Sequence, residues 1–262
     1  MARKGRGRPK RQRRRKQQAQ YEVLDKYPVV PPHAFARIVR DLRTLNIMYQ
    51  AIEPPLNKKE QAQFEELMDI FVKALTADID EIDSDPDGYL RAAMDQIIKS
   101  YGMKITKKSR SKIFYYLKRD LIGYGRMDVL MNDANVEDVS LDGTNIPIFA
   151  YHRKFESVET SIAWPTDEEL ESFVIKLAQR CGKHISVAEP LLDATLMDGS
   201  RIVMKLGYEI STKGSTFCIR RFREDPFSPC DIVAFRTMTS LMVAYMWIAF
   251  QQGISMLFVG GP

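Results

Sequence analysis

YYLKRDLIGYGRMDVLMNDANVEDVSLDGTNIPIFAYHR, residues 115–153, is the stretch in which the hydrophobic pattern changes from helical to extended. Its first residues complete a helical pattern over Ser109–Leu121. Further on, Val136, Val139 and Leu141 lead into Asp142-Gly143, and the apolar segment Ile146–Tyr151 follows. Two short apolar runs around an Asp-Gly turn are typical of paired strands. The sequence therefore predicts that a sheet begins here and that helices precede it.

Upstream of this stretch, the chain predicts a helical subdomain over residues 59–124. Apolar residues recur at steps of three and four in Lys59–Ala77 and Tyr89–Tyr101, as well as in Ser109–Leu121, which defines one buried face on each helix. Residues 21–58 contain prolines around a short segment, Ala34–Leu45, where a helix is expected. We expect residues 21–58 to form an extended, proline-containing strap.

Downstream, residues 125–222 predict an αβ domain with a mostly antiparallel sheet. Ser157–Ala163 is expected to be a strand, and Thr166 opens a helix with Glu169 three residues later, the pattern of a capping box. Three further strands are expected, with a turn at Asp198-Gly199 between the first two. They are Ala194–Met197, Arg201–Leu206 and Thr216–Phe222.

The last part of the chain contains a linker and then a strongly apolar segment. Residues 223–237 carry two prolines and are predicted to be the linker. Thr239–Gln252 is predicted to be a buried helix, and Ile254–Val259 a buried strand that runs into Gly260-Gly261-Pro262. A strand followed by glycines is how a phosphate-binding loop of the form GxxxxGK[ST] begins. An ordinary turn is the alternative interpretation.

Charge is distributed unevenly along the chain, although the net charge is only +5. Residues 1–16 contain ten Lys or Arg and no acid, whereas the remainder holds 29 basic and 34 acidic side chains. We expect residues 1–20 to be a disordered basic tail. The longest apolar run, Leu241–Phe250, has ten residues, against roughly 20 for a membrane span. These features, together with three scattered cysteines, predict a soluble, cytoplasmic protein.

Residues 110–262 resemble the type II/type IV secretion ATPase superfamily, in its archaeal branch of archaellum-motor, pilus and secretion ATPases. Four motifs in the same order carry the resemblance: the stretch quoted above, Asp198-Gly199-Ser200-Arg201, the segment FCIRRF at residues 217–222, and the apolar helix and strand before Gly260. The resemblance implies that residues 238–262 begin a RecA-like P-loop domain. It also implies a parent protein that binds ATP and Mg²⁺ and forms a homo-hexamer. Such a protein would work at the inner face of the cell membrane with a membrane platform protein, powering pilus or archaellum assembly or secretion.

In this family the domain before the ATPase domain closes over the nucleotide. The resemblance implies that Arg201 and Arg220 sense the terminal phosphate, with Arg221 on the other face of the sheet; solvated strand residues are the alternative. Gly260, Gly261 and Pro262 would start the phosphate loop. Because the loop lysine and later motifs are not in these 262 residues, we assign no catalytic residue and expect neither tight nucleotide binding nor hydrolysis by this stretch alone.

Three further groups of residues bear on the site. By family analogy Phe227, Pro229 and Asp231 would lie near the adenine, although ordinary packing explains them as well. Five carboxylates are expected to form a solvated or subunit-facing edge, and the histidines are too separated to suggest a metal site. The carboxylates are Asp128, Asp133, Glu137, Asp138 and Asp142, and the histidines are His33, His152 and His184.

The basic tail supports a rival hypothesis. Its Arg-Gly-Arg-Pro segment resembles an AT-hook, a peptide that lies in the minor groove of A·T-rich DNA. The chain could then be a nucleic-acid-binding protein or a motor that transfers DNA. Attraction to anionic lipid and a merely solubilising tail are the other two interpretations. The cations involved would be Arg6, Arg8, Lys10, Arg11, Arg13, Arg14 and Arg15.

Overall fold

The computed structural model describes residues 21–74, 85–222 and 227–259 of the chain. Its contacts divide the chain into two units, residues 1–222 and residues 223–262, which are described separately. The described residues form a mixed α/β structure with a nine-stranded sheet and seven α-helices. The expected class, a mixed fold with a mostly antiparallel sheet, is confirmed.

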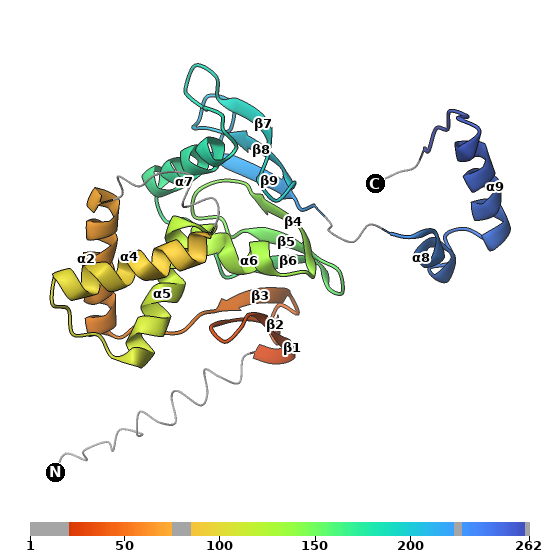
Figure 1. The fold of residues 1–262 in the computed structure, drawn as a ribbon. Helices are drawn as coiled ribbons and strands as arrows, with labels where there is room; N and C mark the ends of the chain where they lie inside the picture. Colours follow the sequence, from red (N-terminus) through yellow and green to blue (C-terminus); the bar gives the residue numbers. More distant parts are fainter. Residues whose placement is uncertain (1–20, 75–84, 223–226, 260–262) are drawn as a thin grey trace, which may run out of the picture. The chain divides into compact units, whose positions relative to one another are not determined.

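All nine strands of the described residues belong to one sheet in unit 1 (Figure 1). Their order across the sheet is β1-β2-β3-β6-β5-β4-β9-β8-β7. Neighbours are antiparallel except β3 and β6, which pair in parallel through Met48 with Glu159 and Tyr49 with Thr160. The strands are β1 Tyr21–Val30, β2 Ala34–Asp41, β3 Ile47–Ile52, β4 Val136–Leu141, β5 Phe149–His152, β6 Glu156–Thr160, β7 Leu191–Thr195, β8 Arg201–Lys205 and β9 Thr216–Arg220.

The N-terminal strap differs most from the prediction. Residues 21–52 form three antiparallel strands that extend the main sheet, and the helix expected over Ala34–Leu45 is wrong. Helical and extended patterns overlap there, because apolar residues occur at both spacings. In the structure Ala34, Ala36 and Ile38 are buried and alternate with more exposed residues. Burial therefore follows the two-residue period of a strand and not the period of a helix.

Three helices form as predicted, and they pack together. They are α2 Lys58–Ala74, α4 Pro86–Ser100 and α5 Lys107–Leu121. Their apolar faces form a separate core that includes Leu67, Phe71, Leu90, Ile113 and Leu117. Asp85 caps α4 and Thr106 caps α5, each accepting a hydrogen bond from a backbone N–H in the first turn. We call these three helices the helical lobe.

The main core lies between the sheet and the helices α6, Asp128–Asn132, and α7, Asp167–Arg180, which follow the short 3-10 helix η1, Gly125–Met127. Thr166 caps α7 through the N–H of Glu169, as the capping box predicted. The Glu169 carboxylate, however, accepts a hydrogen bond from Arg126 at 2.7 Å. The cap is therefore supported by a contact between α7 and η1.

Unit 2 contains α8, Pro229–Ala234, and α9, Ser240–Gln251. Helix α8 lies inside the segment predicted to be a linker. The apolar helix is present as predicted, but within the described residues it is not buried as expected, since only its Ala249 is, and residues 254–259 are not a strand. A strand needs a hydrogen-bonded neighbour, and the described part of unit 2 offers none. Gly260, Gly261 and Pro262 lie outside the described residues, as do residues 1–20.

Candidate functional site

One face of the sheet in unit 1 is open, whereas helices α6 and α7 pack on the other (Figure 1). Strands β8 and β9 alternate accordingly. The register partners Ile202 and Ile219 are fully buried, while Val203, the next residue along β8, is 40% exposed. Four large apolar side chains are exposed on this face, which is more than an ordinary solvated sheet requires. They are Phe149, Tyr151, Leu191 and Val203.

Arg201 and Arg220 lie side by side on the open face. Their Cα atoms are direct partners across β8 and β9, and Arg220 is in turn the partner of Asp138 on β4. Directly opposed residues in an antiparallel pair project from the same face. The register therefore builds one row across the sheet, Thr195, Arg201, Arg220, Asp138 and Tyr151.

Each arginine of the pair is held by one carboxylate. Arg201 Nη2 is 3.4 Å from Asp193 Oδ2, and Arg220 Nε is 3.1 Å from Asp138 Oδ1. The hydrogen bond with Asp138 raises the pKa of Arg220 above its usual value. The two side chains remain 73% and 80% exposed. They keep donors available for an incoming planar or tetrahedral anion.

Arg221 projects from the opposite side of the sheet, as expected for the next residue in a strand. Its Nη1 donates to the carbonyl oxygens of Asp133 and Val136. Burial lowers the pKa of Arg221. Its Nε is buried and has no hydrogen-bond partner in the described part of the chain. Arg221 therefore fixes the loop before β4 and does not contribute to the open face.

A buried polar cluster joins the N-terminal strands to the rest of unit 1. Asp133, only 2% exposed, accepts hydrogen bonds at Oδ2 from the hydroxyls of Tyr27 (2.6 Å) and Tyr49 (2.8 Å). At Oδ1 it accepts from the backbone N–H and side-chain amide of Asn135. The solvated edge predicted for the five carboxylates is thus wrong for Asp133, and also for Asp128, which is 8% exposed. Nothing in the local sequence distinguishes these two from their neighbours.

His152 completes this cluster, and its contacts define its tautomer. Nδ1 accepts a hydrogen bond from the backbone N–H of Lys154 at 3.1 Å, so the proton of the neutral ring is on Nε2. Nε2 lies 2.9 Å from the Tyr27 hydroxyl, which itself donates to Asp133. Burial lowers the pKa of His152, against the opposing effect of Asp133 and Asp25. His152 therefore supports the hydrogen bonds of this buried cluster.

The lowered pKa of His152 predicts that acid weakens this buried polar cluster. A histidine with a folded pKa below its unfolded value favours the folded state above about pH 6.5, and the benefit is lost as pH falls below that value. We expect the free energy of unfolding to fall by up to about 1.4 kcal/mol per pH unit between pH 6.5 and 5. In His152→Gln the fall should be smaller, as measured by urea unfolding.

His33 provides the matched control for this titration. It is less buried, and burial lowers its pKa as well, so His33→Gln should remove a smaller part of the pH dependence. If His152→Gln retained the full pH dependence of the parent, the titration would belong to another group.

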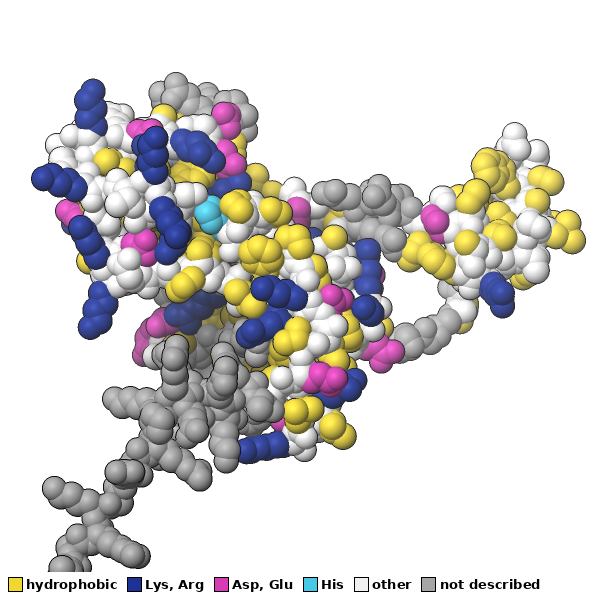
Figure 2. All heavy atoms as spheres, turned by 90° about the horizontal axis from the view of Figure 1, so that it is seen from below, with side chains coloured by type: hydrophobic (Ala, Val, Ile, Leu, Met, Phe, Trp, Pro, Cys, Tyr) yellow, Lys and Arg dark blue, Asp and Glu magenta, His cyan; other side chains and the backbone are white. Residues whose placement is uncertain are grey.

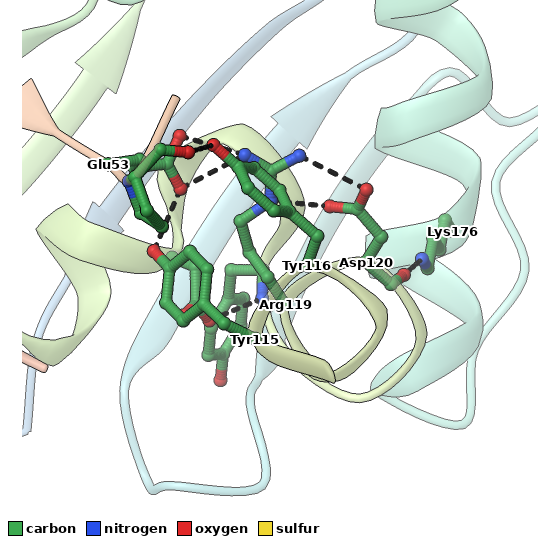
Figure 3. A network of polar contacts seen from close by, with 9 residues as sticks. Glu53, Tyr115, Tyr116, Arg119, Asp120 and Lys176 are labelled. Carbon is green, nitrogen blue, oxygen red and sulfur yellow. Dashed lines mark hydrogen bonds and ion pairs between the residues drawn. The ribbon is translucent and has the colours of Figure 1, made fainter. Parts of the chain in front are cut away.

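A second polar network connects the end of β3 to α5 and α7 (Figure 3). Glu53 accepts from the Tyr115 hydroxyl at 2.8 Å and from Arg119 Nη1 at 2.8 and 3.0 Å. Arg119 also donates through Nε to Asp120 at 2.7 Å. Burial lowers the pKa of Arg119, but the carboxylates of Asp120 and Glu53 outweigh this effect and raise it. Sequence reasoning could not find this network, because Glu53 lies more than 60 positions from Tyr115 and Arg119.

Helix α7 also caps the C-terminus of α5. Lys176 Nζ donates to the Asp120 carbonyl oxygen, and Arg180 Nη2 donates to the carbonyls of Leu121, at 3.1 Å, and Ile122. These carbonyls have no partners within their own helix, so cations there are favourable. A cavity of about 600 Å³ lies beside them, lined by Tyr124, Trp164 and Phe173 among others. The lysine and arginine side chains that line this cavity, such as Lys176 and Arg180, already donate to carbonyl oxygens of the protein. We therefore regard the cavity as a gap in the packing of α5 on α7.

In unit 2, the residues predicted to lie near an adenine have structural roles. Ser228 and Asp231 form a reciprocal capping box at the start of α8, and Pro229 occupies its first turn. Phe227 packs edge-on against Phe235, with ring centroids 5.3 Å apart. The S-x-x-D pattern at residues 228–231 is a signal for a helix start that sequence reasoning missed. Their proposed proximity to a nucleotide stays a prediction.

Comparisons with known proteins find relatives whose functions are not established. No known protein-family profile matches the chain. Three uncharacterized proteins of Methanocaldococcus jannaschii match it: MJ1288 (42% identical over 164 residues), MJ0900 (35% over 158 residues) and MJ0781 (30% over 179 residues). The matches cover 62%, 60% and 68% of this chain, and 65%, 28% and 24% of the relatives. The chain therefore spans only part of each relative's length.

Among solved structures, a weak similarity to the chain is shown by an ATPase of a type IV secretion system. It is the VirB11 ATPase from the Brucella suis type IV secretion system, in complex with sulphate. The TM-score is 0.37 and the identity 16%, over 53% of this chain and 41% of that one. Separately, no helix within the described ranges is long and apolar enough to cross a lipid bilayer.

Proposed function

We propose that this chain is the N-terminal part of an oligomeric secretion-type ATPase, in which unit 1 responds to the phosphates of ATP bound on a following RecA-like domain. The arginine pair on the open sheet face is the observation that carries the proposal. Arg201 and Arg220 are register partners, exposed and individually oriented by carboxylates. Charge spread over phosphate oxygens is well matched by two adjacent planar guanidinium groups.

The exposed apolar side chains around the pair support closure of this face onto another surface. Tyr151 ends the row on β5, Phe149 lies beside it on the same strand, and Leu191 lies on β7. Burying them would remove water from around the ion pairs and strengthen the interaction of the arginines with an anion. ATP binding would then favour the closed arrangement and hydrolysis the open one. Motion of this kind would drive a membrane platform from within a homo-hexamer.

Unit 2 has the composition of the beginning of a domain core. Helix α9 is apolar all round, yet only Ala249 is buried, and Figure 2 shows how much of this unit's surface is hydrophobic. A helix without a polar face belongs in the interior of a larger domain. In the proposed protein, Gly260-Gly261-Pro262 continues into the phosphate-binding loop, whose lysine and hydroxyl hold ATP and Mg²⁺.

The test is ATP turnover by the product of the whole reading frame. Arg201→Ala and Arg220→Ala are each expected to lower kcat by roughly tenfold to a hundredfold, because a phosphate-contacting cation is lost from the closed state. Arg201→Lys should restore only part of the rate, since a lysine lacks the planar donor pair. Binding of a fluorescent ATP analogue should change less than kcat.

Arg153→Ala is the matched control for these variants. Arg153 is likewise an exposed arginine with one carboxylate partner, Glu137 at 2.9 Å, but it lies outside the row. Equal losses in all three alanine variants would indicate a general charge effect and contradict the phosphate-sensing role. A reading frame without GK[ST] after Pro262, or a product that does not bind ATP, would overturn the ATPase proposal itself.

A further inference from the structure

The hairpin formed by helices α4 and α5 carries an unbalanced positive charge. Residues 96–119, which comprise the end of α4, the connecting turn and most of α5, contain eight Lys or Arg and no Asp or Glu. Figure 2 shows Lys and Arg side chains over much of the helical lobe, with acidic side chains between some of them. The question is which of these cations the protein itself neutralises.

Half of the eight cations are paired with carboxylates from other parts of the lobe or from β3. The ion pairs are Arg110 with Asp95, Lys112 with Glu60, Lys118 with Asp87 and Arg119 with Glu53. The other four are exposed and form no ion pair within the described residues. They are Lys99, Lys104, Lys107 and Lys108. We call the surface formed by these four lysines and Tyr101 the basic tip.

The packing of the hairpin places Lys99 and Lys107 on one face. The ion pair between Asp95 of α4 and Arg110 of α5 holds these two residues side by side. Lys99 follows Asp95 by four residues, so both lie on the same face of α4. Lys107 precedes Arg110 by three residues, and the same holds on α5. The lysines of the basic tip are therefore gathered at the end of the hairpin.

The start of α5 is an unfavourable place for cations if stability alone matters. The N-terminus of a helix carries a partial positive charge, which favours acids and disfavours lysine in the first turn. Helices α2, α4 and α7 each have an acid there. Helix α5 begins instead with Lys107 and Lys108 and has no acid in its first turn. The fold does not explain these two lysines, whereas an anion bound from outside would make them favourable.

An exposed aromatic ring accompanies the lysines. Tyr101 follows α4 as its C-cap and is 63% exposed, and its side chain forms no hydrogen bond or ring contact with the described part of the chain. Within residues 85–121 it is the only large hydrophobic side chain that is exposed. Attachment to a bilayer would need more buried apolar surface than one ring offers. A single ring is enough, however, to stack on an unpaired base.

We propose that the basic tip binds single-stranded nucleic acid, with its lysines on the phosphates and Tyr101 stacked on a base. Cations that follow the backbone and an aromatic ring for the bases are the two components of such sites. A duplex would use the lysines but offers no unpaired base to the ring. This inference does not depend on the proposed ATPase, because every residue of the basic tip belongs to the helical lobe.

The experiment measures how binding of the whole chain to a fluorescently labelled oligothymidylate depends on salt. Each phosphate of a single strand that a cation neutralises contributes about 0.7 to the slope of log K against log salt concentration. Lys107→Gln with Lys108→Gln should therefore reduce the magnitude of this slope by about 1.4. Thermal unfolding of this variant should match or exceed that of the parent, because the two cations oppose the helix dipole.

The matched control is Lys73→Gln with Lys213→Gln. It removes the same charge from two lysines that are also exposed and form no ion pair within the described residues. Its salt slope should equal that of the parent. Residues 1–16 are the same in every variant, so any contribution of their ten cations cancels. Equal changes in the two double variants would indicate a general charge effect and overturn the proposal.

Stacking is tested separately from charge. Tyr101→Ala should lower the affinity by at least about fivefold without changing the salt slope, because a stacked base is lost but no cation. Fluorescence of Tyr101→Trp should be quenched by oligothymidylate or oligouridylate, and the stronger quencher identifies DNA or RNA as the ligand. Fluorescence of Val187→Trp, at a position 70% exposed in another loop, should not change.

Three results would contradict binding of a single strand at the basic tip. The first is an unchanged fluorescence of Tyr101→Trp at saturating oligonucleotide. The second is tighter binding of duplex DNA, with no effect of Tyr101→Ala. The third is a Lys107→Gln/Lys108→Gln variant that loses binding to phosphatidylglycerol vesicles but keeps its affinity for the oligonucleotide, which would make the surface a lipid site.

Discussion

Replacing Asp133 with alanine is expected to lower the free energy of unfolding by about 3–5 kcal/mol. The substitution removes the carboxylate that accepts hydrogen bonds from the hydroxyls of Tyr27 and Tyr49. The Tyr49 side chain is fully buried, and its hydroxyl is left without this acceptor. Burial and the nearby carboxylate both raise the pKa of Tyr27 and Tyr49, so these hydroxyls stay protonated and need an acceptor. Urea unfolding of the whole chain measures the loss.

We expect the loss of stability in Asp133→Ala to affect the strands β1–β3 before the rest of unit 1. Amides of β1–β3 are expected to exchange with deuterium faster in Asp133→Ala, while those of β8 and β9 keep their protection until the whole unit unfolds. Tyr49→Phe removes one hydroxyl donor, but the Asp133 carboxylate keeps its hydrogen bonds from Tyr27 and Asn135. This variant should lower the free energy of unfolding by only about 1–2 kcal/mol. A loss below about 1 kcal/mol in Asp133→Ala would show that the cluster does not anchor these strands.

Local signals in the sequence were sufficient for the helical lobe and for the sheet downstream of Val136. Helices α2, α4 and α5 follow from three- and four-residue spacing of apolar side chains, and the β7–β8 hairpin from Asp198-Gly199. The strands β1–β3 could not be predicted in the same way. Apolar residues there fit both a helix and a strand, and the strand β3 pairs with β6, more than a hundred positions away, which no local pattern encodes.

In the candidate site, too, some features follow from local sequence patterns and others depend on contacts between distant elements. Strand periodicity alone places Arg220 and Arg221 on opposite faces, and the structure confirms that separation. That Arg201 and Arg220 are direct partners required the register of β8 with β9. The burial of Asp133 and the capping of α5 by Lys176 arise from contacts between distant elements. Sequence reasoning could identify the residue types but not these neighbours.

The second large effect is expected where Glu53 meets Arg119. Their side chains are only 23% and 14% exposed, so removing either leaves a charge with little solvent to replace its partner. Glu53→Gln and Arg119→Met should each lower the free energy of unfolding by about 3 kcal/mol, and the double variant by clearly less than the sum. A double-mutant cycle should give a coupling energy of about 1.5–3 kcal/mol.

The adjacent pair Lys118 and Asp87 is the matched comparison for this cycle. It also bridges two elements, at 2.6 Å, but both side chains are 46% exposed, and its coupling should not exceed about 1 kcal/mol. Equal couplings for the two pairs would mean that burial contributes nothing at Glu53. A larger coupling at Glu53 would identify the point at which the helical lobe, the N-terminal strands and α7 are held together. Movement of the lobe relative to the open sheet face would then require this network to break.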